Sequence, residues 1–118
     1  MMNKRLGAWG EDVALDYLEK KGLTLLARNY RTREGEVDLV MQTNTTLVLV
    51  EVKTRSRTDS GYPEEAVTEE KLEHLSAAAE KFLEAHPEFV DDWRVDVVAI
   101  IGKPGRNAPQ VEWYQNVG

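Results

Sequence analysis

The sequence predicts an α/β fold in which a mixed β-sheet is flanked by helices. Three observations lead to this class. Apolar residues recur with helical spacing from residue 3 to residue 21 and again between Thr68 and Pro87. Residues 23–55 instead read as a run of strands separated by turn signals. A further strand at residues 93–101 follows the second helix, and that helix is long enough for a right-handed parallel crossover.

The first half of the chain predicts a helix and a first strand. Asn3 can cap a helix that runs to Lys21, and Gly22 is a natural residue for its C-terminal end. Residues 23–30 follow as an apolar strand, and residues 32–35 carry a turn signal in which Gly35 suits a positive φ angle. Glu11 borders the apolar stripe of the helix. Without other information it reads as an edge carboxylate favoured by the helix dipole.

A charged hairpin comes next, joined by a predicted two-residue turn at residues 44–45. Such a turn makes paired positions sum to 89, so Asp38 is expected opposite Glu51, and Glu36 opposite Lys53. Alternation places Glu36 and Asp38 on one face of the first strand and Glu51 and Lys53 on one face of the second. Like charges directly across an antiparallel pair are destabilising, so the pairing of Asp38 with Glu51 asks for an explanation.

The two hairpin strands are otherwise strongly apolar. Val37, Leu39 and Met41 are predicted to form one row, and residues 47 and 49 share a face with Glu51. The second hairpin strand is therefore expected to be covered on both faces. A polar loop at residues 56–67, a helix capped by Thr68, the strand at 93–101, a loop at 102–109 and a short edge strand at 111–114 complete the chain.

Length and composition predict a single domain over residues 1–118 with a substantial core. The chain has no cysteine, which excludes disulfides and thiol chemistry. Its apolar runs are all shorter than the roughly 18 residues that a membrane span requires. No signal-peptide pattern is present at the amino terminus. We therefore expect a cytoplasmic location and no membrane partner.

The net charge of −6 argues against nucleic-acid binding by the whole surface. Basic residues nevertheless gather around the hairpin, and they are Arg28, Arg31, Arg33, Lys53, Arg55 and Arg57. A basic rim beside carboxylates is compatible with a phosphate-backbone substrate. The alternative is that these residues form ordinary surface ion pairs. The acidic balance also makes a partner, or a homodimer, an open expectation for holding a long substrate.

The hairpin carboxylates have the chemistry of a divalent-metal site. Mg²⁺ or Mn²⁺ is commonly held by one or two carboxylates, with water and phosphate in the remaining positions. Asp38 and Glu51 are the candidate metal ligands, and the carbonyl of Val52 can complete the protein ligands. Lys53 is placed to orient water or stabilise an oxyanion, and Glu11 could act through water. Taken alone, Glu-x-Lys is a weak signal, because such triplets also occur on solvated strands.

Several motifs occur in one order along the chain: Gly-x-x-Gly-Glu, Ala-Arg-Asn-Tyr-Arg, Gly-Glu-Val-Asp-Leu-Val, Leu-Val-Glu-Val-Lys-Thr-Arg and Ala-Val-Thr-x-x-Lys. With them the chain resembles the YraN-like family of small bacterial proteins, a branch of the restriction-endonuclease-like superfamily related to the archaeal Holliday junction resolvases. The resemblance implies an αβββαβ core and a metal-dependent nuclease site. Its motifs assign catalytic positions to Glu11, Asp38, Glu51 and Lys53. Val37 stands where the superfamily often has proline.

Two functions from different classes follow. The first is a Mg²⁺- or Mn²⁺-dependent endonuclease that hydrolyses phosphodiester bonds in DNA, with branched or damaged DNA as a candidate substrate. The second is a noncatalytic nucleic-acid-binding or assembly module that retains the nuclease fold. The residues expected to bind substrate are Arg31, Arg33, Arg55 and Lys71, and Glu36 is expected in a supporting role.

Overall fold

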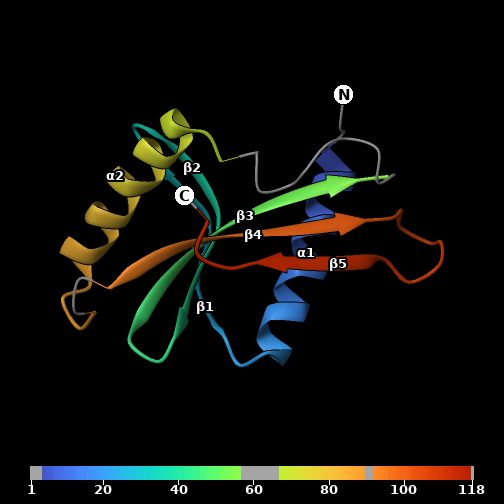
Figure 1. The fold of residues 1–118 in the computed structure, drawn as a ribbon, viewed down its shortest axis with the longest axis horizontal. Helices are drawn as coiled ribbons and strands as arrows, with labels where there is room; N and C mark the ends of the chain where they lie inside the picture. The colour runs from blue at the N-terminus through green and yellow to red at the C-terminus, as the bar shows by residue number, and fades with distance from the viewer. Residues whose placement is uncertain (1–3, 57–66, 90–91, 118) are drawn as a thin grey trace.

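The structure, a computed structural model, describes residues 4–56, 67–89 and 92–117, in which two helices accompany one five-stranded sheet (Figure 1). Along the chain the elements are α1 (Lys4–Lys20), β1 (Thr24–Thr32), β2 (Gly35–Thr43), β3 (Thr46–Arg55), α2 (Glu69–Ala85), β4 (Trp93–Ile101) and β5 (Gln110–Tyr114). The predicted helices and strands are thus confirmed to within a few residues. The predicted helix cap Asn3 lies outside the described residues, as does Arg57 of the basic rim.

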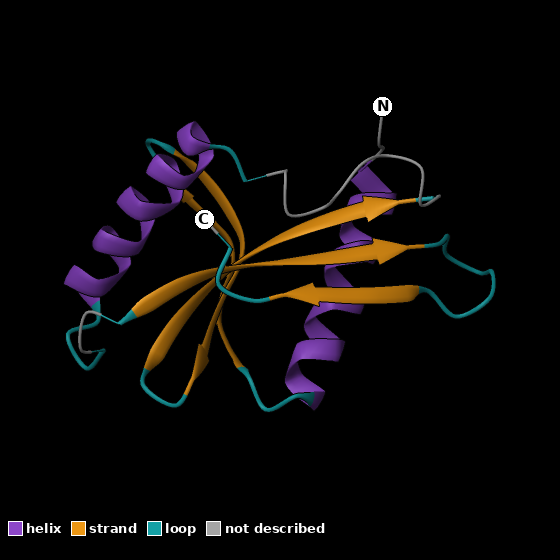
Figure 2. Ribbon diagram, in the orientation of Figure 1, coloured by secondary structure: helices purple, strands orange, loops and turns teal. Residues whose placement is uncertain are grey.

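The strands lie in the order β1-β2-β3-β4-β5. The first three form an antiparallel meander, α2 carries the chain across to β4 parallel to β3, and β5 returns antiparallel to β4. This is the αβββαβ order with a mixed, helix-flanked sheet that the sequence predicted. Figure 2 shows how strongly the strands twist past one another and fan apart at their ends.

The two helices cover opposite faces of the sheet, because side chains alternate along each strand. On one face, Ala14 and Leu18 of α1 pack against Val48, Val50 and Val52 of β3. On the other face, α2 packs against the alternate positions of the same strand, Leu47 and Leu49. The prediction that β3 is covered on both faces is confirmed. Glu51 and Lys53 therefore lie directly after the buried apolar part of this strand.

α1 lies unusually close to the sheet at Gly10. A Cβ atom built on Gly10 would overlap Thr54 Oγ1 and lie 3.0 Å from Thr54 Cβ. Thr54 is itself buried, so its side chain has little room to move aside. The absence of a side chain at Gly10 therefore allows α1 to lie this close to β3, which also determines the position of the neighbouring Glu11.

The turns and helix ends carry the residue types that their backbone conformations favour. Asn44 has φ 53° in the β2–β3 turn and Gly22 has φ 97° after α1, and both residue types tolerate this left-handed region. Thr68 caps α2 by accepting a hydrogen bond from Lys71 N at 3.1 Å. The predicted hairpin register is confirmed from Thr43 opposite Thr46 onward, with paired positions summing to 89.

Two predictions about the hairpin are wrong for the residues beyond the Leu39–Val50 pair. The β2–β3 pairs end with Leu39 opposite Val50, so Asp38–Glu51 and Glu36–Lys53 are not pairs of the ladder. At this point β2 leaves β3 and pairs only with β1, while β3 continues along β4. Val37 consequently does not share the row of Leu39 and Met41, but packs in the cluster on the α2 face.

Candidate active site at the fork between two strands

Asp38 lies where β2 and β3 separate. Its Oδ2 accepts a hydrogen bond of 2.7 Å from the backbone N–H of Val52, an amide beyond the last β2–β3 ladder pair. The carboxylate thus takes the place of a strand neighbour at the inner end of the fork. This holds the side chain against β3 without a flexible loop.

Glu51 is the second carboxylate of the fork and is almost completely buried, with 7% of the residue exposed. Lys53 Nζ lies 3.6 Å from its Oε1, and Lys71 Nζ, from the first turn of α2, lies 3.2 Å from its Oε2. Oε2 is buried and has no hydrogen bond among the described residues, so the ammonium of Lys71 is a charge neighbour without good hydrogen-bond geometry. Leaving a buried carboxylate oxygen without a hydrogen bond costs free energy of folding. A cation bound at Oε2 would supply the missing partner.

Burial and the charge of Glu51 oppose ionisation of the Asp38 carboxyl group. Burial raises the pKa of the Asp38 carboxyl from its ordinary 3.8 to about 7, and the charge of Glu51 adds to the rise. The hydrogen bond from Val52 and the ammonium of Lys71 lower the pKa, but by less. A divalent cation between the two groups would remove this conflict, because it favours the charged form of each.

Glu11 reaches the outer side of the fork from α1. Arg28 Nε lies 3.3 Å from its Oε1, and Arg28 Nη1 lies 2.7 Å from Asp12 Oδ1. With its amide nitrogen facing the carboxylates, Asn29 donates to Glu11 Oε1 at 3.3 Å and to Glu36 Oε1 at 3.0 Å. The charge of Glu11 also raises the Asp38 pKa, which places both residues in one electrostatic environment.

Asn29 and Arg28 were not among the predicted site residues. Asn29 has φ 53°, a left-handed conformation inside β1 that lets its side chain bridge two carboxylates. The sequence signal for it is an asparagine near the end of a predicted strand, since this residue type is depleted in strands. Arg28 was recognised only as part of the basic rim, although its contacts fix the orientation of Glu11.

The other predicted substrate-binding residues divide into two groups. Arg31 is paired with Glu36, whose Oε2 lies 3.1 Å from Arg31 Nη2, and Lys71 is paired with Glu51. Arg33, in the β1–β2 turn, and Arg55, at the end of β3, have no ion pair in the described part of the chain. Only the latter two therefore remain unneutralised for an anionic ligand.

The donor set fits a cation that needs few protein ligands. Across residues 4–56, 67–89 and 92–117, no group of three or more His, Asp or Glu side chains is arranged to hold a metal ion. Mg²⁺ is commonly bound by one or two carboxylates with water in its other positions. Asp38 and the hydrogen-bond-free oxygen of Glu51 supply that number, so the residues present fit such an ion.

Fold and site together define an α/β protein with two carboxylates and a lysine at a fork in a mixed sheet. The chain belongs to the family described as "Uncharacterised protein family UPF0102", whose model matches residues 10–100. A UPF0102 protein of Syntrophomonas wolfei is 47% identical over 106 residues, covering 90% of this chain and 92% of that one. Another, from Beutenbergia cavernae, is 44% identical and covers 96% of this chain and 95% of its own length. The matched segment contains every predicted site residue.

Among solved structures, the chain is similar to SfsA of Pyrococcus furiosus in complex with Ca²⁺. The sequence identity is 11% and the TM-score 0.42, with all of this chain and 65% of that one covered. Neither helix in the described residues is long and apolar enough to cross a membrane.

Proposed function

We propose that this protein is a divalent-cation-dependent nuclease that hydrolyses phosphodiester bonds in DNA. The observation that carries the proposal is the fork between β2 and β3, where Asp38 and Glu51 converge and a buried oxygen of Glu51 lacks a hydrogen bond. A buried carboxyl group whose pKa is raised beside a second carboxylate is suited to a hard cation such as Mg²⁺ or Mn²⁺. Lys53 on the same strand adds the cationic group that phosphate chemistry requires.

Asp38 and Glu51 would hold the cation, with the carbonyl of Val52 as a further ligand. Such a cation would supply a Lewis acid that offsets the charge of the phosphate. The N–H of Val52 already holds Asp38 in place by its 2.7 Å hydrogen bond. Because that bond is independent of any ligand, the fork is organised before a substrate arrives, which reduces the cost of ordering it.

Lys53 is placed to act on the substrate rather than on the fold. Its side chain is 30% exposed while its ammonium lies 3.6 Å from Glu51, so it reaches from the buried carboxylate toward solvent. With Glu51 engaged as a metal ligand, Lys53 would be free to orient the attacking water or to stabilise the developing oxyanion. Glu11, held by Arg28 and Asn29, could accept a proton through water.

A second function is favoured by a specific observation. The carboxylates of the fork are already compensated from within the chain, Glu51 by two lysines and Glu11 by Arg28. Ion pairs of this kind lower the cost of the carboxylates in the absence of a metal. It is compatible with a noncatalytic nucleic-acid-binding or assembly module, whose binding would depend on Arg33 and Arg55.

Cleavage assays with matched variants separate the two functions. Purified protein is incubated with linear, single-stranded and four-way DNA in Mg²⁺ or Mn²⁺, alongside Asp38→Asn and Glu51→Gln. A nuclease loses about 10²-fold or more of its activity in either variant and all of it in chelator, as expected when a group that stabilises the transition state is removed. Glu84→Gln, a change at an exposed carboxylate of α2, is the control and retains activity.

No cleavage by the wild-type protein of any of these substrates, with either metal, would sink the nuclease proposal. If DNA binding then survives Asp38→Asn but weakens in Arg33→Ala/Arg55→Ala, the binding module becomes the better description. Absence of binding at low salt would eliminate that function as well.

A further inference from the structure

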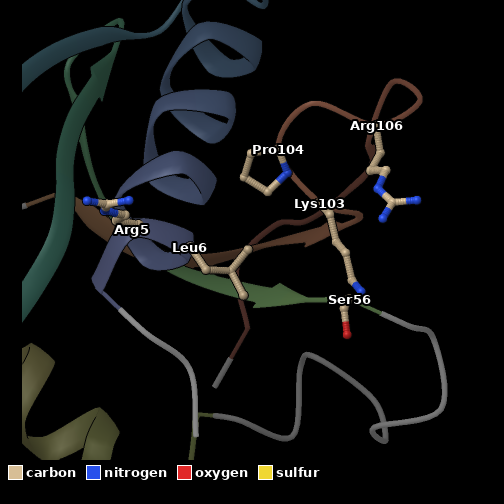
Figure 3. Close-up of a pocket in the computed structure, with 6 residues that line it drawn as sticks. All are labelled: Arg5, Leu6, Ser56, Lys103, Pro104 and Arg106. Carbon is tan, nitrogen blue, oxygen red and sulfur yellow. The ribbon is translucent and has the colours of Figure 1, made fainter.

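A second concave surface lies away from the fork, at the opposite end of α1 from Gly22. This pocket of about 480 Å³ is lined by Arg5 and Leu6 of α1, Ser56 after β3, and Lys103, Pro104 and Arg106 of the β4–β5 loop. In Figure 3, Lys103 extends from the loop toward Ser56 at the end of β3, while Leu6 and Pro104 lie between the loop cations and Arg5. We call these six residues the basic pocket.

The charge of the basic pocket differs from that of the rest of the molecule. Among the described residues, its lining holds three cations and no acidic side chain, in a chain whose net charge is −6. Arg5, Lys103 and Arg106 make no ion pair in the described part of the chain. Other basic side chains are neutralised, and examples are Lys20 by Asp16, Arg28 by Asp12, Arg31 by Glu36 and Arg94 by Asp96. Three unpaired cations around one hollow repel one another unless an anion joins them.

The position of the basic pocket also suits an anion. It lies at the carboxyl ends of the parallel strands β3 and β4, the edge at which open α/β sheets commonly bind ligands. Arg5 lies in the first turn of α1, which contains no acidic residue. Cations are disfavoured at the positive end of the helix dipole, and a bound anion would reverse that penalty.

The basic pocket lies within reach of a nucleic-acid strand that occupies the fork. Arg5 precedes Glu11 by six positions on α1, a rise of about 9 Å. Ser56 follows Glu51 by five positions along β3, about 17 Å in an extended strand. With about 3.4 Å of axis per nucleotide in one strand, these distances correspond to roughly three to five nucleotides.

We infer that the basic pocket binds a backbone phosphate of the nucleic-acid strand whose scissile region lies at the fork, a few nucleotides away. Lys103 and Arg106 contact the phosphate oxygens from the β4–β5 loop, and Arg5 adds positive charge from α1 on the other side of Leu6 and Pro104 (Figure 3). Leu6 and Pro104 supply apolar surface beside the sugar. The phosphate site itself stands on the pocket and its charge, whereas its connection to a strand in the fork rests on the proposed function.

Binding of labelled single-stranded DNA, measured by fluorescence anisotropy in chelator, tests the inference without cleavage. Lys103→Ser/Arg106→Ser is compared with Lys20→Ser/Lys81→Ser, a control that removes two exposed cations from α1 and α2. The pocket variant should bind a strand of about 12 nucleotides at least tenfold more weakly at low salt. Its slope of log K against log salt should become shallower by about 0.7, the change for one lost phosphate contact on a single strand. The control should change affinity by less than twofold.

Strand length and free phosphate identify the source of the anion. A strand of about two nucleotides is too short to span both sites, so the pocket variant should affect it much less than the longer strand. Equal weakening by pocket and control variants would show a general charge effect and overturn the inference. It is also overturned if inorganic phosphate displaces DNA at low millimolar concentration and long strands bind no tighter than short ones.

The two proposals fail separately. Loss of binding confined to the pocket variant supports the phosphate site even when the wild-type protein cleaves nothing in Mg²⁺ or Mn²⁺, a result that sinks only the nuclease. Metal-dependent cleavage with an unchanged KM in the pocket variant leaves the nuclease in place and removes the phosphate site.

Discussion

Lys71 Nζ on α2 lies 3.2 Å from Glu51 Oε2 on β3, and this ion pair joins the first turn of the crossover helix to the strand that precedes it. The ammonium occupies the side of the carboxylate that lacks a hydrogen bond. A cation entering the fork must therefore compete with a charge that the protein itself supplies.

Replacing Lys71 with methionine is expected to destabilise the metal-free protein and to increase its response to metal. Breaking a fully buried pair costs about 3–5 kcal/mol. Because the Lys71 side chain is 31% exposed, solvent screens the pair and we expect a loss of about 1–2 kcal/mol. Chemical denaturation in chelator and in Mn²⁺ measures both effects. The control is Lys81→Met at an exposed position of α2. An equal Mn²⁺ stabilisation of wild type and Lys71→Met would contradict the competition.

The raised pKa of Asp38 predicts a pH-dependent cost in the metal-free protein. A carboxyl group with a folded-state pKa of about 7 and an ordinary value of 3.8 contributes fully to stability below pH 4. That contribution is lost as the pH rises through 7, because the unfolded chain ionises first. Asp38→Asn should therefore gain stability relative to wild type between pH 4 and pH 7.5, by at most about 4 kcal/mol. Denaturation in chelator across this range measures the difference. A stability difference between Asp38→Asn and wild type that stays constant across this pH range would contradict the raised pKa of Asp38.

Gly10→Ala is expected to destabilise the protein although alanine favours helix by about 1 kcal/mol. The added Cβ overlaps Thr54 Oγ1 inside the core, and overpacking of this kind costs about 1–3 kcal/mol. The shift of α1 would also move Glu11. The rate of DNA cleavage should therefore fall even at temperatures where the variant remains folded. A double-mutant cycle with Thr54→Ala checks the cause, since removing Oγ1 should return part of the loss. Additive effects in that cycle would place the origin elsewhere.

Asp96→Asn is expected to lower stability by about 3 kcal/mol without involving the fork. Asp96 is fully buried, and its carboxylate accepts hydrogen bonds from Arg94 Nε at 3.0 Å, Trp113 Nε1 at 2.9 Å and Asn116 N at 2.9 Å. Loss of the charge leaves Arg94 without its partner and loosens the segment after β5. Denaturation followed by tryptophan fluorescence reports the change, with the exposed Glu88→Gln as control. Matching midpoints for the two variants would be inconsistent with this role.

Much of the fold could be predicted because its determinants are local. Asn44 in the hairpin turn fixed the register as far as Val50, and Thr68 marked the start of α2. Charges on strongly apolar strands also drew attention to Asp38 and Glu51. These signals need only residue type and spacing, and they do not depend on what packs against the strand.

The shape of the site could not be predicted in the same way. Beyond Leu39 and Val50, β2 pairs only with β1 while β3 continues along β4, a strand about 40 residues later in the sequence, so the fork is a tertiary feature. The same is true of the ion pair between Lys71 and Glu51, which joins two residues twenty positions apart across the crossover. Asn29 reaches Glu11 only because β1 runs beside α1, a relationship that no local pattern contains.

The hydrogen bond from Val52 N–H to Asp38 Oδ2 gives the fork a spectroscopic reporter. An amide proton held by a strand neighbour is insensitive to side-chain ionisation, whereas this one is held by a carboxyl group that titrates near neutrality. The Val52 amide resonance and its rate of exchange with solvent therefore follow the protonation of Asp38. A single backbone signal makes the charge state of the fork observable in the intact protein, with no substrate and no substitution.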